Sequence, residues 1–537
     1  MTADAGAERQ GNGSDRTAPA RPDGFTGRTA WARNLAAPVR DFLSAETGGA
    51  VVLLAAAAAA LLWANSPWPD SYESFWTTKL SISLGSGGIS LDLRHWVNEG
   101  LMTFFFLVVG LEAKRELDTG ELRERQRLAI PVAAALGGMA VPVAIFLAFN
   151  AGGAGAHGWG AAMSTDTALA LGVVGLVAPR GSRLRLRLLT LAVVDDLVAL
   201  VVIATVYTNN VSFLPLGLAA VFFLLLLALR YAPGTWRRQA AVLLGVALWV
   251  ALFESGIDPV VAGLAVGLVT SAYPPARDDL ERVTELTRSF REQPTPELAR
   301  TAQRSVASAI SANERLQYSL HPWTSYLIVP VFALANAGVH INGGLISDAV
   351  TSPITLGIVV GYVVGKPLGI LGASWIASRP WLAGLRRGLS WPVIAGGGAV
   401  AGVGFTVSVL ISSLAFTGRQ LEEAKVGVLA AAILSSLLAW AAFRVIRLMP
   451  AEVRARQVAA TYEDLLDLSE DVDPDRDHLR GSPDAPVTLV EYGDYECPYC
   501  GRAEVVVREL LDSFGDGLRY VWRHLPLNDV HPNAQMA

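Results

Sequence analysis

Two adjacent carboxylates, Asp195 and Asp196, lie in the middle of an apolar run from Leu189 to Ile203. An Asp at the centre of a bilayer costs about 3 kcal/mol on insertion scales, while each Leu, Ile or Val returns roughly 0.3 to 0.6 kcal/mol. The two acids therefore nearly cancel what about a dozen apolar neighbours contribute. No turn or cap pattern surrounds them, which disfavours the alternative of a capped soluble helix. Because two Leu would make a better span, the carboxylates are predicted to be functional.

Two more charged side chains lie inside apolar stretches. Lys366 falls midway along one such stretch, between Gly365 and Pro367, and Asp166 lies within a Ser-Thr-Asp-Thr sequence. A lone lysine inside a membrane requires a carboxylate partner, and either acid of the 195–196 doublet is a candidate. Adjacent helical residues point about 100° apart, so one Asp is able to face the lysine while the other faces a water-filled cavity.

The segments 164–167 and 402–408 share small and hydroxyl side chains that free backbone groups from a helix. Paired interruptions of this kind in two halves of a transporter indicate an ion site built from half-helices. Asp166 near positive helix ends and Lys366 near negative ones would offset partial charges of about half a unit. Close helix packing through small residues is the alternative explanation for the glycines.

The composition is that of a membrane protein: 52% of residues are hydrophobic and 17% are charged, with a mean hydropathy of +0.39. We expect an all-α polytopic protein, because twelve apolar stretches approach the roughly 20 residues that a bilayer requires. They cover residues 48–64, 97–113, 128–149, 160–178, 188–207, 211–229, 237–253, 257–272, 322–340, 353–377, 390–416 and 424–443.

The charges between these stretches predict an orientation. The even connections are rich in Arg and Lys, including seven Arg between residues 273 and 320, whereas the odd ones hold only Lys79, Arg94, Arg419 and Lys425. By the positive-inside rule the even connections and both termini are cytoplasmic. Residues 80–93, after the first stretch, alternate apolar and polar side chains about a Gly-rich turn, which predicts a hairpin.

Five segments resemble motifs of the NhaA family of sodium/proton antiporters and follow in the same order: Phe104–Leu117, Thr165–Gly172, Val193–Leu197, Gly365–Ile370 and Gly402–Ser408. The resemblance covers about residues 30–447. It implies about twelve transmembrane helices with inverted repeats and two crossing broken helices, in a bacterial plasma membrane.

The resemblance also implies roles for single residues. Asp196 would be the principal cation and proton site, Asp195 would pair with Lys366, and Asp166 and Thr165 would lie at the helix crossing. The Asp-Asp doublet resembles the electrogenic branch, which moves more protons inward than sodium ions outward, with lithium as a second substrate. The hairpin at residues 80–93 resembles the family's homodimer contact.

The chain changes character after residue 450. A strand from Val487, the sequence Cys497-Pro-Tyr-Cys500 at the start of a helix, and a strand at 518–524 resemble a DsbA-type thioredoxin fold. Cys497 is expected to have the lower pKa of the two thiols. We expect this domain to be incomplete, because the chain stops at Ala537 before the later strands and cis-Pro loop. A zinc site is the weaker alternative, for want of further Cys ligands.

We therefore expect a disordered tail and surface helix at 1–40, an antiporter domain at 41–447, a linker at 448–483 and a partial thioredoxin-like domain at 484–537. Two function classes compete. The first is an electrogenic Na+ (Li+)/H+ antiporter for pH and sodium homeostasis, in which cations and protons compete for the same carboxylate oxygens. The second is a membrane-anchored thiol-disulfide oxidoreductase through Cys497 and Cys500. Neither a resident cofactor nor a nucleic-acid partner is expected.

Overall fold

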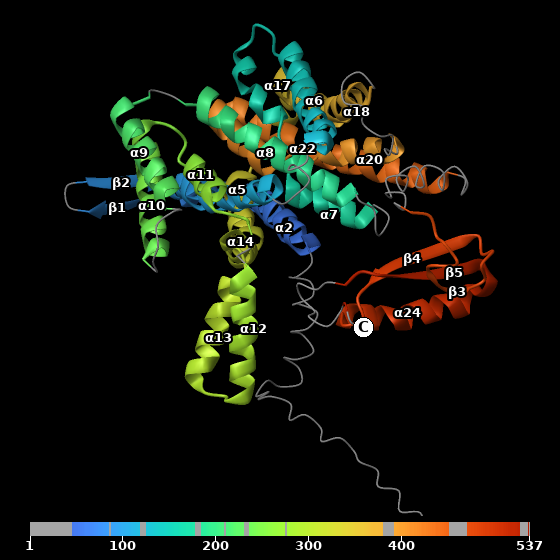
Figure 1. Ribbon diagram of the computed structural model, residues 1–537. Helices are drawn as coiled ribbons and strands as arrows, with labels where there is room; N and C mark the ends of the chain where they lie inside the picture. The colour runs from blue at the N-terminus through green and yellow to red at the C-terminus, as the bar shows by residue number, and fades with distance from the viewer. Residues whose placement is uncertain are drawn as a thin grey trace, which may run out of the picture. The chain divides into compact units, whose positions relative to one another are not determined.

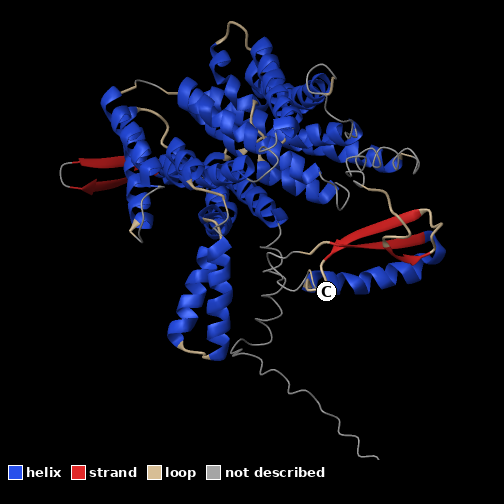
Figure 2. Cartoon of the chain, in the orientation of Figure 1, coloured by secondary structure: helices blue, strands red, loops and turns tan. Residues whose placement is uncertain are grey.

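The computed structural model describes residues 46–84, 87–118, 125–177, 184–208, 211–229, 236–273, 277–379, 391–449, 470–526 and 535. The chain divides into two compact units, residues 1–461 and 462–537. Helices dominate the first unit, and the second combines a small sheet with a helix (Figures 1 and 2). The tail and surface helix expected at 1–40 lie outside the described residues, as does most of the expected linker.

The first unit is built from apolar helices, several of which are broken by short π or 3-10 segments. Its first half contains α2 (Glu46–Ala64), α3 (Pro69–Trp76), α4 (Leu93–His95), η1 (Trp96–Leu101), α5 (Met102–Asp118), α6 (Arg125–Phe149), η3 (Ala154–Ala162), α7 (Thr167–Val177), α8 (Leu184–Val206), α9 (Phe213–Leu229), α10 (Arg237–Ser255) and α11 (Val260–Val269). Its second half contains α12 (Arg277–Glu292), α13 (Pro296–Ser308), α14 (Ala312–Trp323), η4 (Thr324–Ile328), α15 (Val329–Asn336), α16 (Gly343–Thr351), α17 (Pro353–Val360), η5 (Gly361–Gly365), α18 (Lys366–Ala377), α20 (Trp391–Ala401), α21 (Thr406–Ala415) and α22 (Gly418–Leu448).

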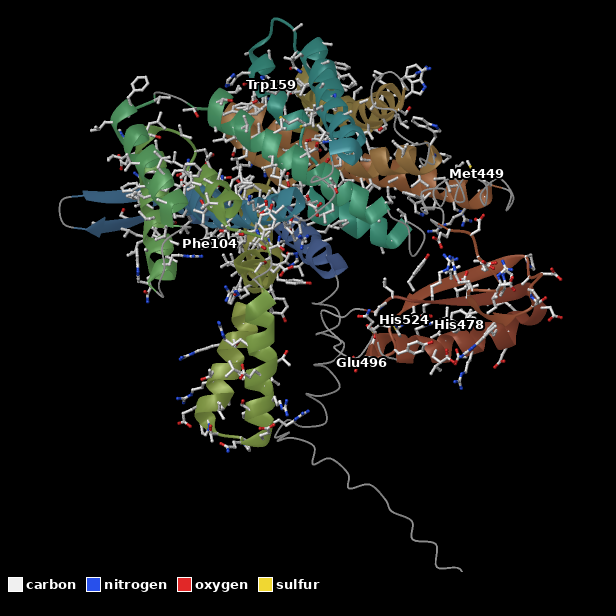
Figure 3. The ribbon with its side chains drawn as sticks, in the orientation of Figure 1. Phe104, Trp159, Met449, His478, Glu496 and His524 are labelled. Carbon is white, nitrogen blue, oxygen red and sulfur yellow. The ribbon has the colours of Figure 1, made fainter. Side chains whose placement is uncertain are left out.

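Within the described residues, five helical stretches are long and apolar enough to cross a membrane, or up to eight if each of three bent pairs is one span. Large apolar side chains cover much of the outer surface, as the sticks of Figure 3 show around Phe104, which is 48% exposed. Exposed apolar surface on this scale marks contact with lipid. The expected class, a mostly helical polytopic membrane protein, is confirmed.

Two of the bent pairs coincide with the predicted interruptions. η3 and α7 meet at 51° around residues 163–166, and α20 and α21 meet at 46° around residues 402–405. The third pair, α2 and α3, bends by 117°. Backbone groups freed at the first two breaks bond to one another, because the amide of Asp166 donates to the carbonyl of Val403 at 2.8 Å. Both breaks therefore lie at one place in the bundle.

The span that carries Lys366 is continuous but contains a π-helical turn. The segment η5 joins α17 to α18, and the amide of Lys366 donates to the carbonyl of Gly361, five residues earlier. A wide turn is favoured here because Pro367 has no N–H to continue the α-helical pattern. This span packs closely on α6, where a Cβ on Gly369 would lie 2.1 Å from the carbonyl oxygen of Gly137. The close backbone contact fixes the depth of Lys366 in the bundle.

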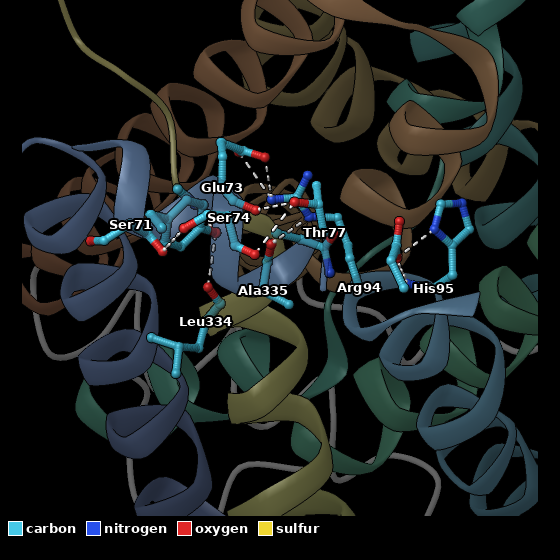
Figure 4. Close-up of polar contacts among 12 residues, drawn as sticks. Ser71, Glu73, Ser74, Thr77, Arg94, His95, Leu334 and Ala335 are labelled. Carbon is cyan, nitrogen blue, oxygen red and sulfur yellow. Dashed lines mark hydrogen bonds and ion pairs between the residues drawn. The ribbon is translucent and has the colours of Figure 1, made fainter. Parts of the chain in front are cut away.

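The predicted hairpin forms β1 (Lys79–Leu84) and β2 (Gly87–Asp92), which pair antiparallel and project from the helices (Figure 1). A polar network ties its base to α15 (Figure 4). Arg94 donates to both carboxylate oxygens of Glu73 at 3.0 Å and to the carbonyl of Ala335 at 3.2 Å. Tyr72 donates to the neighbouring carbonyl of Leu334 at 2.9 Å. These side chains satisfy carbonyls at the end of α15 that the helix itself leaves free.

The second unit is a three-stranded sheet with one helix. Strand β5 (Leu518–His524) lies in the middle, antiparallel to β3 (His478–Gly481) and parallel to β4 (Val487–Gly493), and α24 (Pro498–Phe514) connects β4 to β5. The strands and helix predicted from residue 487 onward are therefore present. Strand β3 lies inside the range expected to be linker, 448–483. With Leu479 as its one apolar side chain, its four-residue sequence gives no alternation to reveal it.

Candidate functional site

The charged centre of the first unit is an ion pair between Lys366 on α18 and Asp195 on α8. The Lys366 Nζ lies 2.8 Å from Asp195 Oδ2, and both side chains are fully buried. The ammonium also donates to the carbonyl of Met163, at the first break. A buried lysine requires such partners, because an isolated ammonium in an apolar interior costs several kcal/mol. The structure thus pairs the lysine with the first acid of the doublet rather than the second.

Thr165 connects this ion pair to the second break. Its hydroxyl lies 2.8 Å from Asp195 Oδ2 and 2.9 Å from the carbonyl oxygen of Ala401. A hydroxyl has one proton, so it donates to one of these oxygens at a time. The other oxygen of Asp195, Oδ1, is buried and has no hydrogen-bond partner among the described residues. A buried carboxylate oxygen without a donor is costly and is therefore an available ligand position.

Asp196 faces a different set of groups from its neighbour. It is 3% exposed, and its Oδ1 accepts from the hydroxyl of Ser164 at 3.3 Å. No ion pair to this carboxylate is found in the part of the chain that the structure describes. The two acids therefore differ in kind: Asp195 has a lysine partner, whereas Asp196 has a weak neutral donor.

Asp166 joins the starts of two half-helices. One oxygen accepts from the amide of Leu169 in α7 at 2.9 Å, and the other accepts from the amide of Thr406, the first residue of α21, at 3.0 Å. A carboxylate at these positions satisfies free N–H groups and offsets the positive ends of both helices. Asp166 is thus an N-cap for both broken helices at once.

The structure therefore gathers Asp166, Asp195, Lys366 and Thr165 at the two breaks, with Asp196 beside Ser164. Sequence reasoning missed Tyr362, a fully buried residue whose hydroxyl lies 2.9 Å from the carbonyl oxygens of both Ala161 and Ser164. The available signal was its position one turn before Lys366 in an otherwise apolar run, which places both on one helix face.

The donor set suits a small alkali cation. Carboxylate, hydroxyl and carbonyl oxygens, which hard cations prefer, come together at the breaks without thiol or imidazole groups. Among the described residues no group of three or more His, Cys, Asp or Glu is arranged to hold a metal ion. The mixed and incompletely satisfied set of oxygens at the breaks fits an ion that binds and leaves.

The predicted redox residues lie in the second unit, which also carries the labelled His478, Glu496 and His524 (Figure 3). Cys497 immediately precedes α24 and Cys500 lies in its first turn, both half-buried and not joined by a disulfide. Cys500 also lines a cavity of about 710 Å³ with Arg480, Glu504 and Trp522 among its other walls.

The two thiols of this unit lie in different surroundings. The pKa of the Cys500 thiol is raised: a backbone hydrogen bond at Asp494 acts to lower it, but burial and the adjacent Cys497 outweigh that bond. A raised pKa leaves less of the nucleophilic thiolate at neutral pH. The lower pKa expected for Cys497 stays a prediction.

A bundle of apolar helices with a buried lysine–carboxylate pair at two helix breaks defines a secondary transporter of the membrane. A family model described as Na+/H+ antiporter 1 matches residues 40–443, and one described as Thioredoxin matches residues 474–537. The chain belongs to the Na+/H+ antiporter family of the first model, which confirms the resemblance found in the sequence.

Individual relatives match most of this chain. The chain is 54% identical over 514 residues to Na(+)/H(+) antiporter NhaA 1 of Salinispora arenicola (strain CNS-205), covering 96% of this chain and 78% of the relative. It is 46% identical over 479 residues to Na(+)/H(+) antiporter NhaA 1 of Mycolicibacterium gilvum (strain PYR-GCK), covering 88% and 76%. A relative from Herminiimonas arsenicoxydans, named Na(+)/H(+) antiporter NhaA, is 41% identical over 505 residues, covering 93% and 79%.

Proposed function

We propose that this protein exchanges Na+ for H+ across a bacterial plasma membrane, with Asp196 as the principal binding group for both ions. The supporting observation is the asymmetry of the doublet: Asp195 has Lys366 at 2.8 Å, whereas Asp196 has the Ser164 hydroxyl at 3.3 Å. The less satisfied carboxylate is the one that gains most from a cation. The same site includes three further side chains that position the groups around Asp196, namely Asp195, Thr165 and Asp166.

Competition for these oxygens couples the two ions. Neighbouring buried carboxylates titrate together, so protonation at one side of the membrane removes the negative charge that holds the cation. The cation leaves, and deprotonation at the other side restores the site. Exchange requires that the site open to one side at a time, which the two broken helices permit because their loops have no continuous helical bonding.

Finer features belong to the same proposal. The Asp195–Asp196 doublet, which resembles the electrogenic branch of the family, supports an exchange with more protons moving inward than sodium ions outward. Li+ is a second substrate because its oxygen preference matches that of Na+. We further propose twelve spans with inverted repeats, in which the broken helices cross, and both termini in the cytoplasm, from the excess of Arg and Lys in the even connections. The exposed edges of the β1–β2 hairpin support a homodimer contact there.

Asp196→Asn is the decisive experiment. In everted vesicles the parent chain should collapse a pH gradient on addition of Na+ or Li+, and the variant should show no exchange above background. Cys497→Ser should exchange at the parent rate. Exchange that survives Asp196→Asn would refute the proposal, and sodium flux without opposing proton movement would indicate a channel instead.

A second candidate function, thiol-disulfide oxidoreduction, is supported by the place of Cys497 immediately before α24, where helix N-terminal amides favour a thiolate. It predicts dithiol-dependent reduction of insulin by the full chain. That activity should survive Asp196→Asn and disappear in Cys497→Ser. Insulin reduction at background in the parent chain, or undiminished in Cys497→Ser, excludes this second function.

A further inference from the structure

Tyr362 contacts both broken helices and lies next to the lysine. It is fully buried in η5, one turn before Lys366, and its ring centroid lies 5.8 Å from the Lys366 Nζ. Its hydroxyl lies 2.9 Å from the carbonyl oxygens of Ala161 and Ser164, on the first bent pair. It also lies 2.5 Å from the hydroxyl of Ser408, on the second bent pair.

The phenol has fewer protons than these neighbours require. It donates one proton, so the carbonyls of Ala161 and Ser164 compete for it. If the phenol donated its proton to Ser408, neither carbonyl would receive it. The phenol can therefore donate to one of the two carbonyls only if the Ser408 hydroxyl donates to the phenol oxygen. This arrangement therefore uses one tyrosine and one serine to hold the backbone on either side of Met163.

Ser164 links this backbone contact to the ion site. Its carbonyl accepts from Tyr362, and its own hydroxyl donates to Asp196 Oδ1 at 3.3 Å. Ser164 and Thr165 lie between η3 and α7, outside the regular hydrogen-bonding pattern of either helix. The hydrogen bond to the carbonyl of Ser164 therefore restrains the direction of its hydroxyl, together with the bond from the Asp166 amide to the carbonyl of Val403.

A second close contact keeps the phenol in place. A Cβ added to Gly404, in the other break, would lie 2.6 Å from Tyr362 Cζ and 2.7 Å from its hydroxyl oxygen. The absence of a side chain at residue 404 therefore gives the tyrosine its position. The space beside Gly404 therefore accommodates both the ring and the hydroxyl of Tyr362. A side chain that served only to fill this space would not need the hydroxyl.

We propose that Tyr362 is a positioning residue of the ion site: by holding the Ser164 carbonyl it keeps the Ser164 hydroxyl aimed at Asp196 and so sets the apparent affinity for the transported cation. The inference rests on the proposed antiport at Asp196. Tyr362 itself does not contact the carboxylate oxygens in this structure, and its effect passes through Ser164.

Tyr362→Phe removes the hydroxyl and keeps the ring over Lys366. In everted vesicles we expect the apparent KM for Na+ and Li+ to rise about fivefold, with the maximal rate changed less than twofold. Ser164→Ala should raise KM to a similar extent. Because both variants disrupt one route, the double variant should be no worse than the more affected single variant.

Tyr207→Phe is the matched control. Tyr207, which follows α8, is also buried, and its hydroxyl contacts the first bent pair. The hydroxyl donates to the carbonyl of His157 at 2.9 Å and accepts from the amide of Gly160 at 3.0 Å. It loses a comparable hydrogen bond away from Asp196, so KM should stay within twofold of the parent. Equal KM values for Tyr362→Phe and Tyr207→Phe, or additive effects of Tyr362→Phe and Ser164→Ala, would overturn the inference.

Asp196→Asn is measured in the same vesicles. Exchange in Asp196→Asn refutes the antiport site itself, whereas its loss there together with an unchanged KM in Tyr362→Phe refutes only the role of Tyr362. If Tyr362→Phe fails to reach the membrane, Ser408→Ala decides, since it keeps the phenol and removes its donor. We expect a two- to threefold rise in KM for Ser408→Ala, and an unchanged KM rejects the proposal.

Discussion

Two ion pairs, one fully buried in the first unit and one partly buried in the second, differ in how completely their atoms are satisfied. In the second unit, Arg523 binds both oxygens of Asp477, at 3.1 and 2.7 Å, and its remaining donors reach the carbonyls of Glu470 and Asp471 and the hydroxyl of Tyr492. In the first unit, Lys366 contacts one oxygen of Asp195 and leaves the other without a partner among the described residues.

The difference teaches which pair is structural. A bidentate arginine–carboxylate pair with every donor engaged fixes a geometry and gains nothing from a further ligand. A point-charge ammonium on one carboxylate oxygen, beside a second carboxylate, leaves coordination free for an exchanging ion. We therefore regard Asp477–Arg523 as a structural latch that holds residues 470–477 against the sheet. We regard Asp195–Lys366 as part of the proposed ion-binding site.

Lys366→Met should have the largest effect. It leaves the Asp195 carboxylate buried without a counter-charge, which costs about 3–5 kcal/mol of stability, and exchange should fall to background. The Lys366→Met/Asp195→Asn double variant removes both charges and should recover most of the stability but none of the native exchange. Thermal unfolding in detergent and vesicle exchange measure the two effects. A double variant as unstable as the single one contradicts a direct pairing.

Arg523→Met should affect the other unit alone. Loss of the latch should free residues 470–477 and accelerate proteolysis of the C-terminal unit in the full chain several-fold, with Na+/H+ exchange unchanged. Arg508→Met is the control, because Arg508 is 72% exposed and its ion pair, among the residues the structure describes, is an i,i+4 pair with Glu504. Equal proteolysis rates for the two variants would show that the fully hydrogen-bonded Arg523–Asp477 pair contributes no more to stability than the exposed Arg508–Glu504 pair.

Thr165→Ala should give a smaller change within the first unit. It removes a donor shared by Asp195 and the Ala401 carbonyl, so we expect a rise of about threefold to tenfold in the apparent KM for Na+. Thr165→Ser keeps the hydroxyl and should stay within twofold of the parent. Initial rates of exchange against Na+ concentration test both, and a serine variant as impaired as the alanine variant would implicate the methyl group instead.

The smallest expected effect is a pH dependence of the latch. Arg523 lowers the pKa of Asp477 below its ordinary 3.8 through a side-chain hydrogen bond. A carboxylate whose pKa is depressed on folding stabilises the fold above its unfolded pKa, and this contribution is lost as the pH falls through the folded value. Proteolysis of the C-terminal unit should therefore be constant between pH 5 and 8 and rise below pH 4. In Asp477→Asn the rise attributable to this pair should be absent.

Much of the charged cluster at the two breaks could be predicted because charged side chains are costly inside apolar runs. Asp195, Asp196 and Lys366 are conspicuous in apolar runs, and the small and hydroxyl residues near 165 and 402 predicted the breaks. Which acid pairs with the lysine was open on the residues alone, because helix geometry separates the two acids without saying where α18 lies. The resemblance implied Asp195, and the structure has that arrangement.

Other features could not be found in this way. Tyr362 is unremarkable in sequence, because a tyrosine in an apolar run is as well explained by an ordinary buried hydroxyl. Its importance arises from contacts to residues 46 and 201 positions away along the chain. Strand β3 was missed for a related reason. It forms by pairing with β5, and its own sequence has almost no pattern.

The carboxylate of Asp166 connects the first turns of two helices through a single side chain. Its oxygens bond separately to the first turns of α7 and α21, so a displacement of either segment away from the other breaks a hydrogen bond and uncovers a helix end. A movement that kept both bonds would have to carry the two segments together as a rigid assembly. Under the proposed alternating access, the two segments would either move together or separate by breaking a bond at this one side chain, and a cross-link between residues 166 and 406 would permit only the joint movement.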